Sequence, residues 1–301
     1  MKELRPIKLI VLVIQMISAL CASWTIFDIC RMSRISHVKQ FLLLIAFGNL
    51  ITGLSLVMEL FYGENTLTCA IALYGENFGQ QIAIVSSSVL GIFAFKSVTQ
   101  LELDNFDKYV KKCIWFTIII SFLLETPPCF PFFVYTYGHA DDCKYMRNEA
   151  ISESVFVTGT LAMGLLEIVP FLVVSLIFYM KLMYYLKSHF DKALKKTRFL
   201  KIERLFWYPL AQFVLYFPNA LWWLDSTLRR NFAFDDIISY STAILEASAG
   251  ISTAVLYYFF SKSLDKREEL LNEEIRISLV TNDEVDFHGG RYASEYILPI
   301  N

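Results

Sequence analysis

Long apolar stretches alternate with short polar segments along the chain, and each stretch is long enough to cross a bilayer as a helix. About 20 apolar residues in an α-helix span the ~30 Å hydrocarbon core of a membrane. The stretches that meet this requirement are Ile7–Ile29, Val38–Phe61, Thr66–Phe95, Ile114–Val134, Ser154–Leu182, Leu205–Trp223 and Ile237–Phe260. The pattern predicts an all-α membrane protein, with a seven-helix transmembrane bundle over residues 1–260 and a tail over residues 261–301.

Three segments depart from a simple apolar run. The first stretch continues past Trp24 to Ile29, which is longer than the apolar region of about 7–15 residues in a signal peptide. A retained helix is therefore favoured over a cleaved signal. The polar residues from Glu76 to Gln81 interrupt the third stretch and make it the weakest of the seven. In the tail, Ser261–Leu271 is basic and then acidic, a pattern that fits a short interfacial helix.

The composition agrees with a membrane protein. Apolar residues make up 55% of the chain and aromatic residues 16%, which a soluble domain of this size would expose as aggregation-prone patches. The net charge of −2 indicates no nucleic-acid partner. The histidines all lie outside the apolar stretches, and no pattern of intramembrane nucleophile and base is found, so no enzyme, metal site or cofactor is expected.

The lysines and arginines orient the bundle. Successive loops of a membrane bundle lie on alternate sides of the membrane. Sorted in this way, twenty lysines and arginines fall on the side of the tail and seven on the side of the N-terminus. Cytoplasmic loops carry the excess of positive charge. The distribution predicts that the N-terminus is outside and the C-terminus is inside.

Two cysteines fall on the predicted outer side. Cys69 opens the third stretch and Cys143 lies in the connection after the fourth, so both face an oxidising space. A disulfide between them would fix the longest outer loop to the top of the third helix. Two free thiols are the alternative.

The sixth and seventh stretches carry local motifs. Pro209 and Pro218 are eight residues apart in the sixth, and a proline within a helix removes a hydrogen bond and creates a pivot. Small residues run through Ala247–Tyr257 in the seventh, where they permit close helix contacts.

These motifs resemble the slime-mould cyclic-AMP receptor family of G-protein-coupled receptors. Ser248, Gly250, Thr253 and Tyr257 stand at the positions of its seventh-helix pattern, and Asn49 replaces the aspartate common in the second helix of receptors. The resemblance implies a plasma-membrane receptor for a small extracellular ligand, coupled to a heterotrimeric G protein. It implies a switch built from Asn49, Pro209, Pro218, Gly250, Thr253 and Tyr257. The substitutions at Asn49 and Thr253 alter the family's polar network, and cyclic AMP as the ligand does not follow.

Carboxylates within the apolar stretches are the candidate ligand contacts, because a charge inside the bilayer is costly. Glu76 lies two helical turns, or ~10.5 Å, after Cys69, and Glu246 is deep in the seventh stretch. For both, protonation and a hydrogen bond to a neighbouring helix is an equal alternative, and it is the favoured one for Glu167. Tyr216 and Gln80 complete the candidate set, although an interhelical hydrogen bond is the favoured role of Gln80. The lack of deep outer cations predicts a neutral or cationic ligand, with a shallow anion site at Arg147, Arg229 and Arg230 as the rival.

The predicted inner surface is basic. The third inner loop ends in candidate G-protein contacts, namely Lys195, Lys196, Arg198, Lys201 and Arg204, for which contact with anionic membrane lipid is an equal alternative. The seventh stretch contains no lysine for a retinal Schiff base. A seven-helix transporter or channel without G-protein coupling is the alternative to a receptor.

Overall fold

The structure is a computed structural model, and it describes residues 6–32, 37–62, 66–99, 106–127, 133–134, 146–147, 171, 173–185, 188, 207–219, 221 and 237–260. The contacts divide the chain into two units, Met1–Tyr257 and Tyr258–Asn301. Nearly all the described residues belong to the first unit. The predicted boundary between bundle and tail, after residue 260, stays a prediction.

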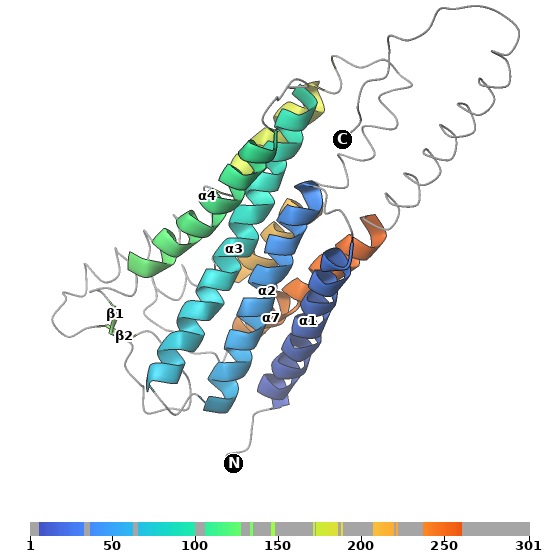
Figure 1. Cartoon of the computed structure of the whole chain (residues 1–301). Helices are drawn as coiled ribbons and strands as arrows, with labels where there is room; N and C mark the ends of the chain where they lie inside the picture. The colour runs from blue at the N-terminus through green and yellow to red at the C-terminus, as the bar shows by residue number, and fades with distance from the viewer. Residues whose placement is uncertain are drawn as a thin grey trace, which may run out of the picture. The chain divides into compact units, whose positions relative to one another are not determined.

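Four long helices open the chain and run alternately in opposite directions (Figure 1). They are α1 (Pro6–Cys30), α2 (His37–Tyr62), α3 (Thr66–Thr99) and α4 (Phe106–Pro127), and each packs against the helix before it. The connections between them are short, which makes consecutive helices antiparallel neighbours. The end of α1, the start of α2, the end of α3 and the start of α4 therefore share one end of the bundle.

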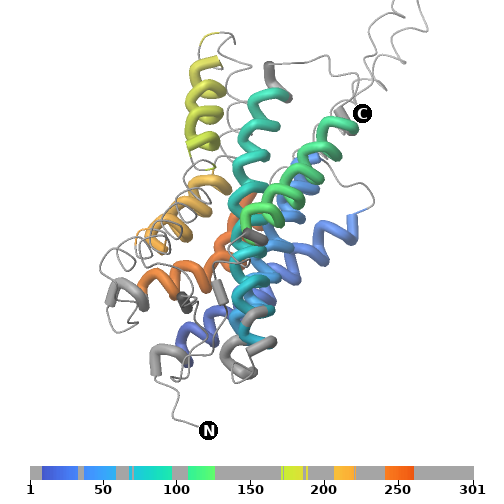
Figure 2. The backbone as a smooth tube through the Cα atoms, turned by 90° about the vertical axis from the view of Figure 1, so that its left-hand side faces the viewer, coloured from blue at the N-terminus to red at the C-terminus, as the bar shows by residue number. Residues whose placement is uncertain are grey.

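The second half of the chain adds further helical segments. Val173–Tyr185 is an apolar helix that lies along the C-terminal half of α3 (Figure 2), where the Ser175 hydroxyl is 2.9 Å from that of Ser88. A second segment spans residues 207–219, and its Leu215 and Tyr216 share a buried cluster with Ile84 of α3. The final helix is α7 (Ile237–Ala247), which continues beyond Ser248 as Ala249–Phe260.

Several helices are long and apolar enough to cross a membrane. Leu9–Cys30, His37–Met58 and Ile71–Lys96 qualify individually, and Ser241–Ala247 with Ala249–Phe260 makes a fourth if the bent pair is one span. Large apolar side chains also point outward from the helices, as at Leu20, where hydrocarbon is a better solvent than water. The protein is therefore an all-α membrane protein. The count of seven spans and their orientation stay predictions.

The third predicted helix is confirmed, because α3 is continuous through the polar residues from Glu76 to Gln81. The fourth prediction is wrong in its boundaries. Helix α4 begins at Phe106 rather than Ile114 and ends at Pro127, and Phe133–Val134 forms strand β1. Strand β1 pairs antiparallel with β2 (Met146–Arg147). Two consecutive prolines, Pro127 and Pro128, disfavour continuation of the helix, which explains the early end.

The seventh predicted span is a helix with a break. Ser248 separates its two arms, which are bent by 46°. The Ser248 hydroxyl donates to the carbonyl oxygen of Leu245 at 2.6 Å, and its amide N–H is shared between the carbonyls of Ile244 and Leu245 at 3.1 Å. A serine side chain that bonds its own helix backbone is a recognised cause of helix bending.

Helices α2 and α3 approach each other closely through two glycines. A Cβ on Gly48 would lie 2.5 Å from the carbonyl oxygen of Gly79, and a Cβ on Gly79 would lie 2.6 Å from the carbonyl oxygen of Gly48. Both distances are too short for any side chain. The two backbones therefore meet directly, as small residues allow in membrane helix pairs.

Candidate functional site

Glu76 lies in the first third of α3, two turns after Cys69. Helix α2 supports its backbone, because the Thr52 hydroxyl is 3.2 Å from the carbonyl oxygen of Glu76. Its side chain is partly buried and lies close to the side chain of Glu246. The two predicted ligand carboxyls, 170 residues apart in sequence, thus meet in the bundle.

Glu246 is buried and is held by two carboxamides. The side-chain N–H of Gln80 donates to one carboxyl oxygen, and Nδ2 of Asn219 donates to the other at 2.8 Å. Gln80 belongs to α3 and Asn219 to the segment 207–219. The predicted interhelical hydrogen bond of Gln80 is therefore present, and three helices meet at the Glu246 carboxyl.

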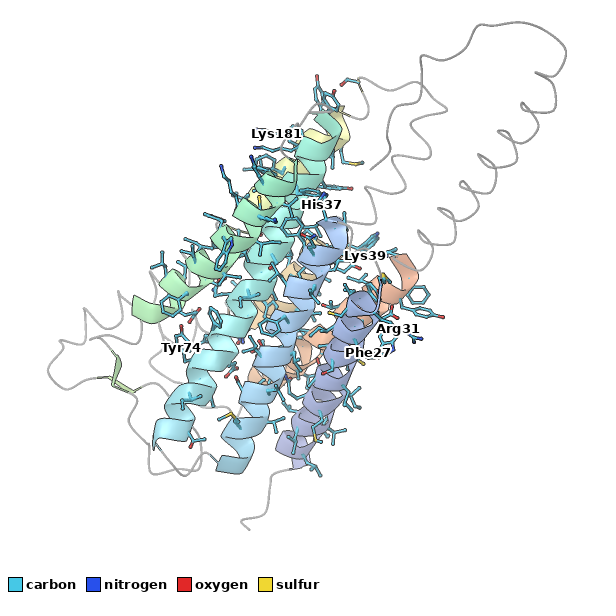
Figure 3. The ribbon with its side chains drawn as sticks, in the orientation of Figure 1. Phe27, Arg31, His37, Lys39, Tyr74 and Lys181 are labelled. Atoms are coloured by element: carbon cyan, nitrogen blue, oxygen red, sulfur yellow. The ribbon has the colours of Figure 1, made fainter. Side chains whose placement is uncertain are left out.

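No cation balances these two carboxyls within the described part of the chain. The lysines and arginines with described side chains lie at the other end of the bundle, where α1 and α3 end and α2 and α4 begin; they are Arg31, Lys39, Lys96, Lys108, Lys111, Lys112 and Lys181. In Figure 3, Lys39 and Lys181 lie towards this end, and Tyr74 lies lower, on α3. A carboxyl pair in a medium of low dielectric attracts a positive charge or holds a proton.

A second polar cluster lies around Asn49 of α2. Its Nδ2 donates to the Thr253 hydroxyl at 2.8 Å and is 3.4 Å from the carbonyl oxygen of Ala249. The Tyr216 hydroxyl donates to the Asn49 Oδ1 at 3.2 Å. Asn49, Thr253 and Tyr216 are all almost completely buried. Two predicted switch residues therefore touch each other, and the hydroxyl of Tyr216, a predicted ligand contact, is directed to them.

The Ala249–Phe260 arm of the seventh helix is fixed to α1. The backbone N–H of Gly250 donates to the Ser18 hydroxyl at 2.8 Å, and the approach is so close that a Cβ on Gly250 would clash with the Ser18 carbonyl oxygen. The Tyr257 hydroxyl donates to a carboxyl oxygen of Asp28 at 2.8 Å, and its ring meets the edge of Trp24 at 6.2 Å between centroids.

Ser18, Asp28 and Asn219 are contacts that the sequence analysis did not single out. Asp28 was detectable in principle, because it is a carboxylate near the end of an apolar stretch. Asn219 follows Pro218 directly and was detectable in the same way, as a polar group in an apolar segment. Ser18 had no signal, because serine is common in membrane helices and bonds their own backbone.

The two prolines lie near the limits of the segment 207–219. Pro209 is the third residue of this helix and Pro218 the second from its end. A pivot at Pro218 involves residues after 219, most of which lie outside the described part of the chain. That pivot stays a prediction.

Most of the remaining predicted site residues lie outside the described part of the chain. Cys69 is disulfide-bonded, whereas Cys21, Cys30 and Cys113 are free. The partner of Cys69 lies outside the described residues, as does Cys143, so their pairing stays a prediction. Lys195, Lys196, Arg198, Lys201 and Arg204 lie outside them as well.

No protein-family model matches the chain, and no curated protein matches its sequence.

Proposed function

We propose that this protein is a seven-span G-protein-coupled receptor of the plasma membrane, a divergent relative of the slime-mould cyclic-AMP receptors. The antiparallel order of α1 to α4 supports an up-and-down bundle. The seventh-helix residues of the resemblance, Gly250, Thr253 and Tyr257, all face neighbouring helices, as parts of a switch must. Fold-level likeness alone assigns no function, so the proposal depends on the polar site.

The basic end of the bundle is the cytoplasmic end in this proposal. Positive side chains that gather at one end of membrane helices mark the inner side. Lys195, Lys196, Arg198, Lys201 and Arg204 then follow on the same side and supply the G-protein surface. The first residues of α1 and the Cys69 end of α3 face outward, where a Cys69–Cys143 disulfide would form.

The observation that carries the proposal is the meeting of Glu76, Gln80 and Glu246 in the outer half of the bundle. Two carboxyls without a cation among the described side chains suit a ligand that carries an ammonium or several hydrogen-bond donors. A phosphate-bearing ligand would meet repulsion there. The ligand of this receptor is therefore neutral or cationic.

The signal passes from this site along the seventh helix. Glu246 stands two residues before the break at Ser248, and the arm beyond the break contacts Asn49 and Asp28. A ligand that draws Glu246 away from Gln80 and Asn219 changes the position of the outer arm. The inner arm and the segment 207–219, through Tyr216 and Pro218, respond by opening the cytoplasmic end to the G protein.

Second-messenger output against a panel of cationic, neutral and anionic ligands, in cells expressing the full chain, tests this proposal. Glu76→Gln should weaken an active cationic ligand by about 1.5–3 kcal/mol, the size of a charged hydrogen bond. Glu125→Gln, a buried carboxyl on α4, is the matched control and should leave the response unchanged.

Three results contradict the proposal in different ways. Loss of the response in Arg147→Ala or Arg230→Ala, with Glu76→Gln unaffected, indicates an anionic ligand at the outer surface. Epitope tags at both ends labelled from the same side of the cell exclude the seven-span topology. Ligand-dependent solute flux without any second messenger indicates a transporter or channel.

A further inference from the structure

One face of α4 is exposed along its whole described length. Its exposed residues recur every three or four positions, which places them on a single side of the helix. They are Lys108, Lys111, Lys112, Trp115, Phe116, Ile119, Phe122 and Leu123. The opposite side carries Val110, Thr117, Ser121 and Glu125, all buried. The α4 face, as we name these eight exposed residues, therefore has no covering element among the described residues.

Polarity changes in a regular order along the α4 face. The three lysines come first, Trp115 follows ~4.5 Å further along the helix axis from Lys112, and apolar side chains continue to Leu123, about 16 Å from Lys112. A phospholipid leaflet changes in the same order, from charged headgroup through the interface to acyl chains. Tryptophan prefers the interface, and lysine extends from an apolar helix towards the headgroups.

Among the described residues, the three lysines of the α4 face have no partner for their charge, whereas a nearby lysine has one. Lys96, at the end of α3, lies 4.5 Å from the centre of the Tyr109 ring of α4, in a cation–π contact. Within the described part of the chain, no ion pair or hydrogen bond engages Lys108, Lys111 or Lys112. Three positive charges exposed within about one turn, with no anionic partner among the described side chains, attract a negatively charged partner.

We infer that the α4 face binds an anionic phospholipid, with its headgroup at Lys108, Lys111 and Lys112, its glycerol region at Trp115 and its acyl chains along Ile119, Phe122 and Leu123. The apolar two-thirds of this face decide between lipid and other polyanions. A nucleic acid or an acidic protein segment would satisfy the lysines and leave Trp115 and Leu123 against water. An anionic lipid satisfies both parts at once.

The inference does not depend on receptor function. It extends the membrane-contacting part of the protein to α4, which is not among the helices that qualify as spans by length and composition. Helix α4 does not qualify because it contains the charged residues Lys111, Lys112 and Glu125. These charges are compatible with membrane contact, because the lysines lie at headgroup depth and Glu125 is buried within the protein.

Fluorescence quenching by brominated lipids tests this site in the full chain. Trp24, Trp207, Trp222 and Trp223 are replaced by Phe, so that Trp115 is the single emitter, in vesicles that mix brominated phosphatidylserine or brominated phosphatidylcholine with unlabelled lipid. We expect phosphatidylserine to be favoured at Trp115 by about fivefold or more, which corresponds to the contribution of at least one lysine. A chain with Trp24 as its single emitter is the matched control, because Trp24 is an exposed tryptophan on a different helix, α1.

Lys108→Gln, Lys111→Gln and Lys112→Gln together should bring the preference at Trp115 to about one and leave Trp24 unchanged. Should this triple variant fail to fold, raising the salt concentration in the parent chain replaces it, because salt screens exposed charges and should lower the same preference. Equal quenching by the two lipids at Trp115 overturns the inference, as does a preference that neither the substitutions nor salt reduces. An absence of any quenching at Trp115 shows that the α4 face does not contact lipid.

Discussion

The contact between α2 and α3 and the contacts of the seventh helix hold the same bundle by different means. Gly48 and Gly79 let two backbones touch, so that any added atom collides with main chain on the other side. The seventh helix has one such contact, at Gly250 against the Ser18 carbonyl of α1, and is otherwise held by side-chain hydrogen bonds of Glu246 before its break and of Thr253 and Tyr257 after it. Backbone contact has one arrangement, whereas hydrogen bonds can exchange partners. The α2–α3 pair and the Gly250 contact are therefore the fixed points of the molecule, and the parts of the seventh helix held by hydrogen bonds are the parts able to move.

The largest effect should come from Gly79→Val. Its side chain would begin 2.6 Å from the Gly48 carbonyl oxygen and 2.7 Å from the Thr52 nitrogen, and neither main-chain atom can yield without separating α2 from α3. We expect a loss of stability of about 3 kcal/mol or more, seen as loss of monodisperse protein in detergent.

Gly91→Ala is the control for that experiment. It lies in the same helix, and an added Cβ there meets nothing within 4 Å. Thermal stability should stay unchanged or rise by about 0.5–1 kcal/mol, the advantage of Ala over Gly in a helix. A well-folded Gly79→Val variant would show that the α2–α3 contact is not fixed.

An intermediate effect should follow from Asn49→Leu. The substitution removes one hydrogen-bond partner each from Thr253 and Tyr216, and both are buried. Leaving buried polar groups without partners costs about 1–3 kcal/mol, so the thermal unfolding temperature should fall measurably.

In the proposed receptor the same variant should also change basal second-messenger output, because Asn49 bonds α2 to the segment 207–219 and to the seventh helix. Asn49→Asp keeps the shape and an acceptor for Tyr216 and should retain more of the stability. If Asn49→Leu and the parent chain unfold at the same temperature, the hydrogen bonds around Asn49 do not stabilise the bundle.

The smallest effect should come from Tyr257→Phe. It deletes the single hydrogen bond to Asp28 and keeps the ring against Trp24. Hydrogen bonds between membrane helices contribute about 0.6 kcal/mol on average, so we expect only a slight loss of thermal stability. Hydrogen–deuterium exchange of 249–260 should rise while that of α3 does not. Tyr184→Phe, at an exposed tyrosine outside this contact, is the control and should change neither.

The sequence predicts the straight helices well and the irregular ones poorly. The predicted stretch Val38–Phe61 lies within one residue of α2 at each end, because continuous apolarity and bilayer thickness determine both. The prediction of α4 failed because hydropathy excludes Lys111 and Lys112, which lie in the helix with exposed side chains, and because it ignored the effect of Pro127. The break at Ser248 depends on a side chain bonding its own backbone, which hydropathy does not measure.

The candidate ligand residues were selected from the sequence, but their partners were not. A carboxylate in an apolar stretch is visible as a costly exception, which identified Glu76 and Glu246. That they meet depends on the rotation and the depth of two helices far apart in the chain. These quantities come from packing, including the glycine contact that sets α3 against α2, and no local pattern contains them.

The arrangement around Glu246 also bears on how the chain is assembled in the membrane. Its partners Gln80 and Asn219 lie on segments that are synthesised before the seventh helix. During biogenesis these amides, and the Nδ2 of Asn49, lie inside the bilayer without the groups of the seventh helix that later bond them. Chains stopped before α7 would display this unsatisfied polar seam to lipid and to the quality-control machinery, and insertion of the last helix would close it.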